Sequence, residues 1–175
     1  MGPGTTRRRT GGVVIEKASI EKIRAAVAAS SDESLEEAFD RFFSDQAELC
    51  SFLMDVTSAS RQRVRELTLY LSYVVYRTVT DASGHAPGPV TPERITAASL
   101  ASQEWIQKIS ELDDSGFQAA TATRIGVEPY LLGYVVTEVQ DAIDDGLELR
   151  DEEKGTVFFV MKTVIALMSA EPGDL

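Results

Sequence analysis

The sequence predicts an all-α protein, a single-domain irregular helical bundle of about seven or eight helices with a flexible N-terminal arm. Apolar residues recur at three- and four-residue spacing through most of the chain, and no segment shows the sustained alternation of a strand. Helix-start signals also recur, and Thr91-Pro92-Glu93 is the clearest of them. A chain of 175 residues, 43% of them hydrophobic, is sufficient for one domain with a sizeable core.

Three parts of the chain differ in composition. Residues 1–17 are predicted to form a flexible basic arm that ends in a short extended segment, because Gly, Thr and Arg predominate in its first twelve residues. Residues 18–170 are predicted to form the all-helical domain, and residues 171–175 a short tail.

The first half of the domain is predicted to contain four helices. Ser19 is the expected cap of the first, and Ser34, or Ser31 or Asp32 slightly earlier, opens the second. The third is expected to start with Asp45 and Glu48 at capping-box spacing, and the fourth at Ser60, to run over Arg61–Thr80. Their apolar stripes include Ile20, Ile23, Val27, Leu35, Ala38, Phe39, Phe42, Leu49, Phe52, Leu53 and Val56.

The second half begins after the Gly/Pro-rich residues 81–90, which break the fourth helix. Thr91 is the expected cap of a helix that runs to about Asp113, with Val90 packed against Ile95. A shorter helix is expected after Ser115, another from Pro129, and the last from Glu152 to Ser169.

Charge and cysteine content exclude several classes of protein. The net charge is −11, although Arg7, Arg8 and Arg9 form a basic group in the arm. Such an acidic chain favours partners with basic surfaces and makes nucleic acid and membranes poor partners. The single Cys50 cannot form an internal disulfide, which indicates a cytoplasmic protein. The longest apolar segment, residues 157–168, is too short to span a membrane.

The segment DAIDDGLELRDE, residues 141–152, partly matches the calcium loop of an EF-hand. Ile143 stands where the loop needs an oxygen ligand, and the helical spacing of the preceding residues continues through it. We therefore expect a helix to continue through Ile143 and to end at Gly146 in the left-handed conformation, followed by a helix that starts near Asp151.

No other group of residues indicates catalysis, a metal or a cofactor. The acidic residues Glu33, Glu36, Glu37 and Asp40 are predicted to face water. Cys50 is predicted to be a buried thiol rather than a nucleophile, because its only available base is His85 in the Gly/Pro-rich loop. The chain is therefore predicted to be non-catalytic, with no cofactor.

The fourth helix carries apolar residues on two sides. Tyr70, Tyr73 and Tyr76 cover much of one side, which indicates either a central helix or a tyrosine-rich pocket or interface. We predict a homodimer with Tyr73 and Tyr76 nearest the partner. Arg61, Arg63 and Arg65 occupy the start of the same helix, where ion pairs with acidic residues, rather than a bound anion, are expected to offset the helix dipole.

The function expected from these observations is a cytoplasmic protein–protein interaction, regulatory or assembly role. Two alternatives stay open. One is a regulator or hydrolase with a small-molecule pocket near Tyr70 and Tyr73. The other is a nucleic-acid-associated protein that acts through the arginines of the arm, Arg7 to Arg9.

Overall fold

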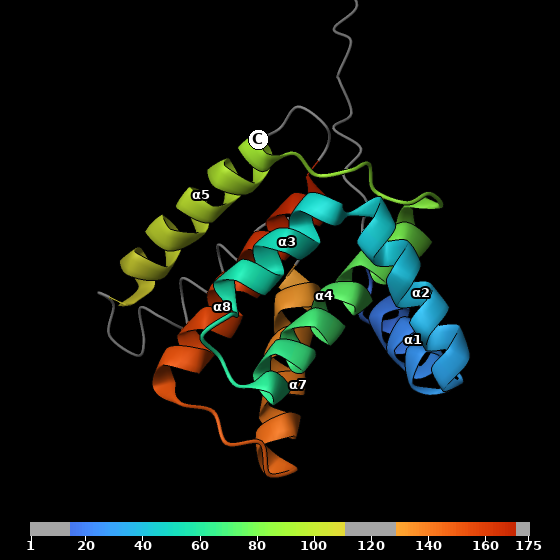
Figure 1. Cartoon of the computed structure of the whole chain (residues 1–175), viewed down its shortest axis with the longest axis horizontal. Helices are drawn as coiled ribbons and strands as arrows, with labels where there is room; N and C mark the ends of the chain where they lie inside the picture. The colour runs from blue at the N-terminus through green and yellow to red at the C-terminus, as the bar shows by residue number, and fades with distance from the viewer. Residues whose placement is uncertain (1–14, 111–128, 171–175) are drawn as a thin grey trace, which may run out of the picture.

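The computed structural model describes residues 15–110 and 129–170. These residues form seven helices and no strand (Figure 1), which confirms the all-α fold class. The helices are α1 (Lys17–Ala28), α2 (Asp32–Asp45), α3 (Ala47–Val56), α4 (Gln62–Ser83), α5 (Pro92–Ser110), α7 (Pro129–Asp144) and α8 (Asp151–Ser169).

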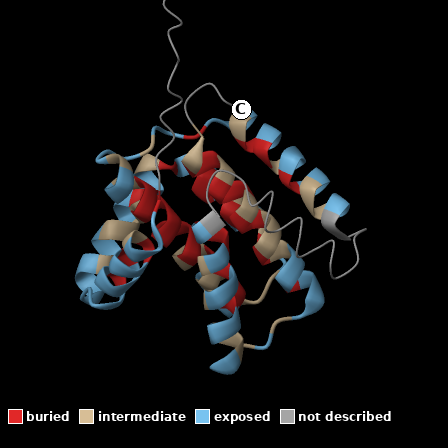
Figure 2. Ribbon diagram, turned by 180° about the vertical axis from the view of Figure 1, so that it is seen from behind, coloured by how far each residue is buried: buried red, intermediate tan, exposed pale blue. Residues whose placement is uncertain are grey.

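Helices α4 and α8 form the centre of the bundle. They pack against each other; α8 also packs on α5 and α7, and α4 on α1. Helix α3 bridges α4, α5 and α8, and α2 packs against α3. Figure 2 shows that the buried residues gather where the helices face one another, while the outer faces are exposed. Within the described part of the chain, no helix is both long enough and apolar enough to cross a bilayer.

The observed helix starts agree with those predicted from the sequence in two places and differ from them in three. Thr91 Oγ1 accepts the N–H of Arg94 at 3.4 Å, as predicted, and Ser31 caps α2 through the N–H of Ser34. Helix α1 begins at Lys17, before the region that Ser19 was expected to cap, because the N–H of Ser19 already bonds to the carbonyl of Glu16. Its predicted apolar stripe is buried: Ile20, Ile23 and Val27.

Ile15, which falls in the segment expected to be an arm, is also buried. Residues 1–14 and 171–175, which contain most of the predicted arm and the whole predicted tail, lie outside the described residues, as does the helix expected after Ser115. The folded part of the chain therefore includes at least Ile15 on its N-terminal side.

The start of α4 is capped by a distant residue rather than by Ser60. Arg61 is the N-cap, and its backbone N–H donates to Glu153 Oε1 at 3.1 Å. The Arg61 guanidinium binds the same carboxylate, with Nε 3.1 Å from Oε1 and Nη2 2.7 Å from Oε2, and also donates to the carbonyl of Glu148. Glu153 Oε2 accepts the N–H of Arg150 at 3.1 Å at the start of α8. We call this arrangement the Arg61–Glu153 clasp; it joins the starts of two helices and confirms the predicted ion pairing for Arg61.

The start of α3 is set by Gln46 rather than by Asp45, which is the last residue of α2. The Gln46 side chain is buried, and its Nε2 donates to the carbonyls of Pro87 and Gly88 at 3.0 and 3.1 Å. Its Oε1 accepts the N–H of Val90 at 3.1 Å. This amide therefore fastens the connection between α4 and α5 to the junction of α2 and α3.

Candidate functional site

Two of the tyrosines predicted to bind a partner are core residues. The side chain of Tyr73 is 1% exposed and that of Tyr76 is 6% exposed. The ring centroid of Phe42, from α2, lies 5.8 Å from that of Tyr73 and 5.0 Å from that of Tyr76. The Tyr76 hydroxyl donates to Asp45 Oδ2 at 3.0 Å. This corrects the homodimer hypothesis in its original form, because α2 already covers the side of α4 that was assigned to a second copy.

Tyr70, the third tyrosine, is half-buried and faces α7 rather than solvent. Arg7, Arg8 and Arg9 lie outside the described residues, so their predicted role in association stays a prediction. Of the six residues proposed to bind a partner, only Tyr70 lies beside a cleft in the described part of the chain.

The calcium-like segment is a helix end. Helix α7 runs through Ile143 to Asp144, and Gly146 has a φ of 91°, as predicted. The N–H of Leu147 donates to the carbonyl of Ala142 at 2.8 Å, and that of Gly146 to Ile143 at 3.0 Å, which together make a Schellman motif. The backbone geometry is that of a helix C-terminus followed by α8, not that of a calcium loop.

The other sequence-level candidates have ordinary structural roles. Cys50 is buried, which confirms that prediction, and burial raises the pKa of its thiol to about 12. His85 is exposed in the loop after α4. Four of the acidic residues of α2, Glu33, Glu36, Glu37 and Asp40, are exposed as predicted. Across residues 15–110 and 129–170, no group of three or more His, Cys, Asp or Glu side chains is arranged to hold a metal ion.

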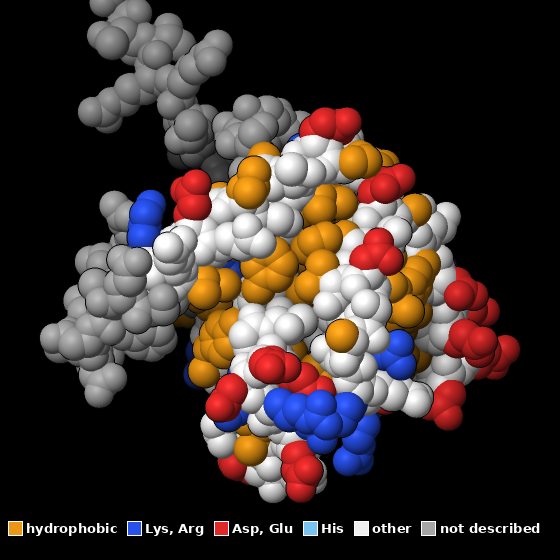
Figure 3. All heavy atoms as spheres, turned by 60° about the vertical axis from the view of Figure 1, so that its left-hand side comes forward, with side chains coloured by type: hydrophobic (Ala, Val, Ile, Leu, Met, Phe, Trp, Pro, Cys, Tyr) orange, Lys and Arg blue, Asp and Glu red, His pale blue; other side chains and the backbone are white. Residues whose placement is uncertain are grey.

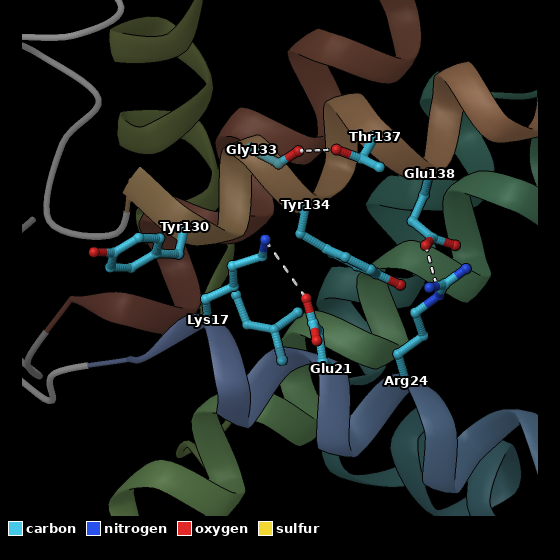
Figure 4. A pocket seen from close by; sticks show the side chains of 9 residues that line it. Lys17, Glu21, Arg24, Tyr130, Gly133, Tyr134, Thr137 and Glu138 are labelled. Atoms are coloured by element: carbon cyan, nitrogen blue, oxygen red, sulfur yellow. Dashed lines mark hydrogen bonds and ion pairs between the residues drawn. The ribbon is translucent and has the colours of Figure 1, made fainter.

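A cleft of about 340 Å³ lies between α1 and α7. Figure 4 shows Lys17, Glu21 and Arg24 of α1 along one wall. The other wall is α7, which contributes Tyr130, Gly133, Tyr134, Thr137 and Glu138. The two helices run alongside each other because the Ile20 face of α1 and the apolar face of α7 share the core. We call this feature the α1/α7 cleft.

One end of the α1/α7 cleft holds a buried carboxylate. The side chain of Glu138 is 12% exposed, and one of its oxygens lies 2.7 Å from Nε of Arg24. Burial raises the pKa of Glu138 despite this ion pair, and the nearby Asp141 raises it further. Burial also raises the pKa of Tyr70 and Tyr134, next to Glu138. The buried hydroxyl of Tyr134 lies beside that of Tyr70, but among the described residues it has no partner at good hydrogen-bond geometry.

The outer face of the first half of α7 is uncharged and exposed. Tyr130 is 52% exposed and Val136 is 45% exposed, and Gly133 and Thr137 are exposed beside them. We call these four residues the α7 strip. The segment from residue 129 to residue 137 contains no charged side chain, although the chain has a net charge of −11.

Exposed apolar atoms alone do not identify a site, because they also occur elsewhere (Figure 3). Within residues 15–110 and 129–170, the large exposed apolar side chains are Phe43, Met54, Leu100, Tyr130 and Val136. The first three lie singly on α2, α3 and α5, whereas α7 carries the last two. Helix α7 is therefore the described element that carries two of these side chains.

Neither the α7 strip nor the Arg24–Glu138 pair was predicted from the sequence. A local signal existed for the strip, since YLLGYVV, residues 130–136, places a glycine in the middle of an uncharged helical segment. No such signal existed for Glu138, whose partner lies on another helix.

Comparisons of the chain with protein-family models, with curated proteins and with solved structures find no match.

Proposed function

We propose that this chain is a non-catalytic protein-interaction protein that binds its partner through the α7 strip and the adjoining α1/α7 cleft. The observation that carries the proposal is the strip itself, an uncharged face with Tyr130 and Val136 bare on an otherwise acidic chain. Exposed apolar residues that cluster on a soluble protein are characteristic of interaction surfaces, and tyrosine is enriched at their energetic centres.

The chemistry of the cleft favours binding over catalysis. Glu138 is held by Arg24 at 2.7 Å, so a general base there would first have to leave its ion pair. The raised pKa values of Tyr70 and Tyr134 keep both phenols protonated at neutral pH. These tyrosines can donate hydrogen bonds to a bound group, but they do not supply a nucleophile.

A second candidate function is the binding of a small polar molecule. The observation in its favour is the buried Tyr134 hydroxyl near Glu138, which lacks a well-formed hydrogen bond that an acceptor group could supply. The volume of about 340 Å³ lies near the lower end of the range for small-molecule pockets. Native mass spectrometry of the purified protein tests this candidate, because a retained ligand adds a discrete mass that Tyr134→Phe should abolish.

The proposed function is tested by site-specific photocross-linking in cells of the source organism. A photoreactive phenylalanine analogue replaces Tyr130 in one variant and Leu100, which is similarly exposed on α5, in the control. The Tyr130 position is expected to give a discrete cross-linked protein band that the Leu100 position does not give. Adding Val136→Asp should remove the band, because a charge is introduced into the strip.

Two results contradict the proposal. One is the absence of any discrete product at position 130. The other is an identical pattern at positions 130 and 100, which would indicate unspecific surface contacts.

A further inference from the structure

The exposed face of α7 changes in charge along the helix. The uncharged α7 strip occupies its first half. Gln140, Asp141 and Asp144 continue the same face at spacings of three and four residues, and all three are exposed. One continuous face is therefore uncharged toward the start of the helix and acidic toward its end.

No basic residue of α7 offsets the acidic end of this face. The C-terminus of a helix carries a partial negative charge, so acidic side chains are unfavourable there and cations are favourable. Asp141 is 53% exposed and lies 3.9 Å from Arg24, which is closer to Glu138, at 2.7 Å. Asp144 accepts a hydrogen bond from the amide of Gln140 at 2.9 Å. A cation brought to this end would offset both the carboxylates and the helix dipole.

The segment before α1 has the complementary pattern in the same order. Residues 1–14 lie outside the described residues, and the described chain begins at the buried Ile15. Counted back from Ile15, residues 14 to 10 are uncharged and residues 9 to 7 are arginines, and no acidic residue precedes Ile15. We call residues 7–14 the arm segment. Its uncharged and basic parts follow one another as the uncharged and acidic parts of the α7 face do.

The two patterns also start at the same place and match in length. Lys17, two residues after Ile15, lines the same end of the α1/α7 cleft as Tyr130 (Figure 4). Asp141 follows Tyr130 by eleven residues, which is about 17 Å along a helix. The five uncharged residues 10–14 also span about 17 Å when extended. The arginines of the arm segment can therefore reach the acidic end of the face.

We propose that the arm segment binds along the exposed face of α7, with its arginines on Asp141 and Asp144 and its uncharged residues over the α7 strip. The arm segment then competes with the partner for this surface, and this competition rests on the proposed function. Exposed ion pairs are individually weak. However, attachment at Ile15 gives the arm segment an effective concentration on the order of millimolar at this face, so weak contacts suffice.

The inference is tested by internal photocross-linking in the purified chain. A photoreactive phenylalanine analogue replaces Gln140, which lies beyond the α7 strip and about 15 Å along the helix from Tyr130. Glu16 is the first acidic residue of the sequence, so digestion after acidic residues releases residues 1–16 as one peptide. We expect a product with the mass of one chain in which position 140 is joined to that peptide.

Charge reversal tests the proposed ion pairs. The joint change of Arg7→Glu, Arg8→Glu and Arg9→Glu should lower the yield of the internal product about tenfold, because like charges then meet. Asp141→Lys with Asp144→Lys should lower it to a similar extent. A chain that carries both sets of changes should regain the yield, since opposite charges face each other again.

The matched control is Glu36→Lys with Glu37→Lys on α2, which changes the net charge as much as the aspartate reversals do. It should leave the yield unchanged, because particular carboxylates rather than the overall charge hold the arm segment. Salt at about 0.5 M should lower the yield of the chain without charge reversals, since exposed ion pairs are screened. Circular dichroism establishes that all variants are folded.

Four results overturn the inference. They are the absence of an internal product, a product joined to another part of the chain, a yield that charge reversal does not change, and an equal loss in the α2 control. A product with the mass of two chains would assign the face to a second copy instead.

The cross-link at Tyr130 in cells measures the proposed function separately. Its band should become stronger in the arginine-reversal variant, because the arm segment no longer competes, and an unchanged band would reject the competition. An internal product at position 140 without any discrete product at position 130 would reject the proposed function alone. The opposite pair of results would reject only the arm segment as occupant.

Discussion

Two Arg–Glu pairs in this chain have the same closest nitrogen–oxygen distance, 2.7 Å, yet the two carboxyl groups behave in opposite ways. In the Arg61–Glu153 clasp, the pKa of Glu153 is lowered to about 2. In the Arg24–Glu138 pair, the pKa of Glu138 is raised. Both side chains are largely shielded from solvent, with 7% of Glu153 and 12% of Glu138 exposed, yet burial dominates the pKa of Glu138 and hydrogen bonds dominate that of Glu153.

The two carboxylates also differ in the number of donors around them. Glu153 accepts hydrogen bonds from the Arg61 side chain and from the backbone N–H groups of Arg61 and Arg150, and these bonds stabilise the charged form. Glu138 is paired with Arg24, and burial and Asp141 both act against its charge. One ion pair does not offset the loss of water, whereas an ion pair with two backbone donors does.

The comparison separates a pair that joins two helix starts from a pair that lines a surface cleft. The Arg61–Glu153 clasp joins the starts of α4 and α8 and satisfies backbone groups that helix ends leave open. The Arg24–Glu138 pair lines the α1/α7 cleft, which adjoins the surface proposed to bind a partner.

The largest expected effect is on stability. Glu153→Gln should lower the melting temperature substantially, because the amide NH₂ group replaces an acceptor and leaves a buried donor of Arg61 or Arg150 without a partner. Glu138→Gln should change the melting temperature only slightly, because it removes an unfavourable buried charge while it releases a half-exposed Arg24. Calorimetry of both variants checks this order. Equal losses would show that the extra donors around Glu153 do not matter.

The pH dependence of stability should differ in sign between the two carboxyl groups. The pKa of Glu153 in the folded chain lies below its ordinary value of about 4.3. Its contribution to the stability of the folded state is therefore complete above about pH 4.3 and is lost as the pH falls toward about 2. Glu138 has a raised folded pKa, so its protonated form favours folding, and this contribution is lost as the pH rises through the raised value.

Urea denaturation of the wild type and the two Gln variants, from neutral pH down to about 3, measures both signs. As the pH falls, the difference in the free energy of unfolding between the wild type and Glu153→Gln should shrink. The free energy of unfolding of Glu138→Gln should fall relative to that of the wild type. Parallel curves for all three proteins would contradict the assignment.

The smallest expected effect concerns one glycine near each pair. Gly133→Ala in α7 and Gly155→Ala in α8 should each stabilise the monomeric chain by about 0.5–1 kcal/mol, because both lie in helices with open space at the Cβ position. Only Gly133→Ala should weaken the photocross-link at position 130, since Gly155 lies outside the α7 strip. Denaturation and cross-linking of both variants provide the measurement. An equal loss of the cross-link in Gly155→Ala would remove the special role of Gly133.

The sequence predicted those features whose signals are local. Thr91 caps α5, and Gly146 ends α7, because each depends on residues within one turn. The succession of helices along the chain and the burial of Cys50 likewise follow from the three- and four-residue spacing of apolar residues.

The features that the sequence did not predict depend on distant partners. Glu153 meets Arg61 across 92 positions, so no local pattern could reveal that it caps α4 in place of Ser60. Tyr73 and Tyr130 both follow helical spacing, and only the packing of neighbouring helices decides that the first is covered and the second is bare. The proposed site was therefore less predictable than the fold.

The Gln46 amide has a consequence for the motions of the chain. Its hydrogen bonds reach residues 41 to 44 positions away, so they form only when the α2–α3 junction and the connection before α5 are both in place. An irregular connection ordinarily opens by itself at little cost in free energy. This one cannot release Val90 without leaving a buried amide unsatisfied, and its opening is therefore tied to the cooperative opening of the helices that it joins.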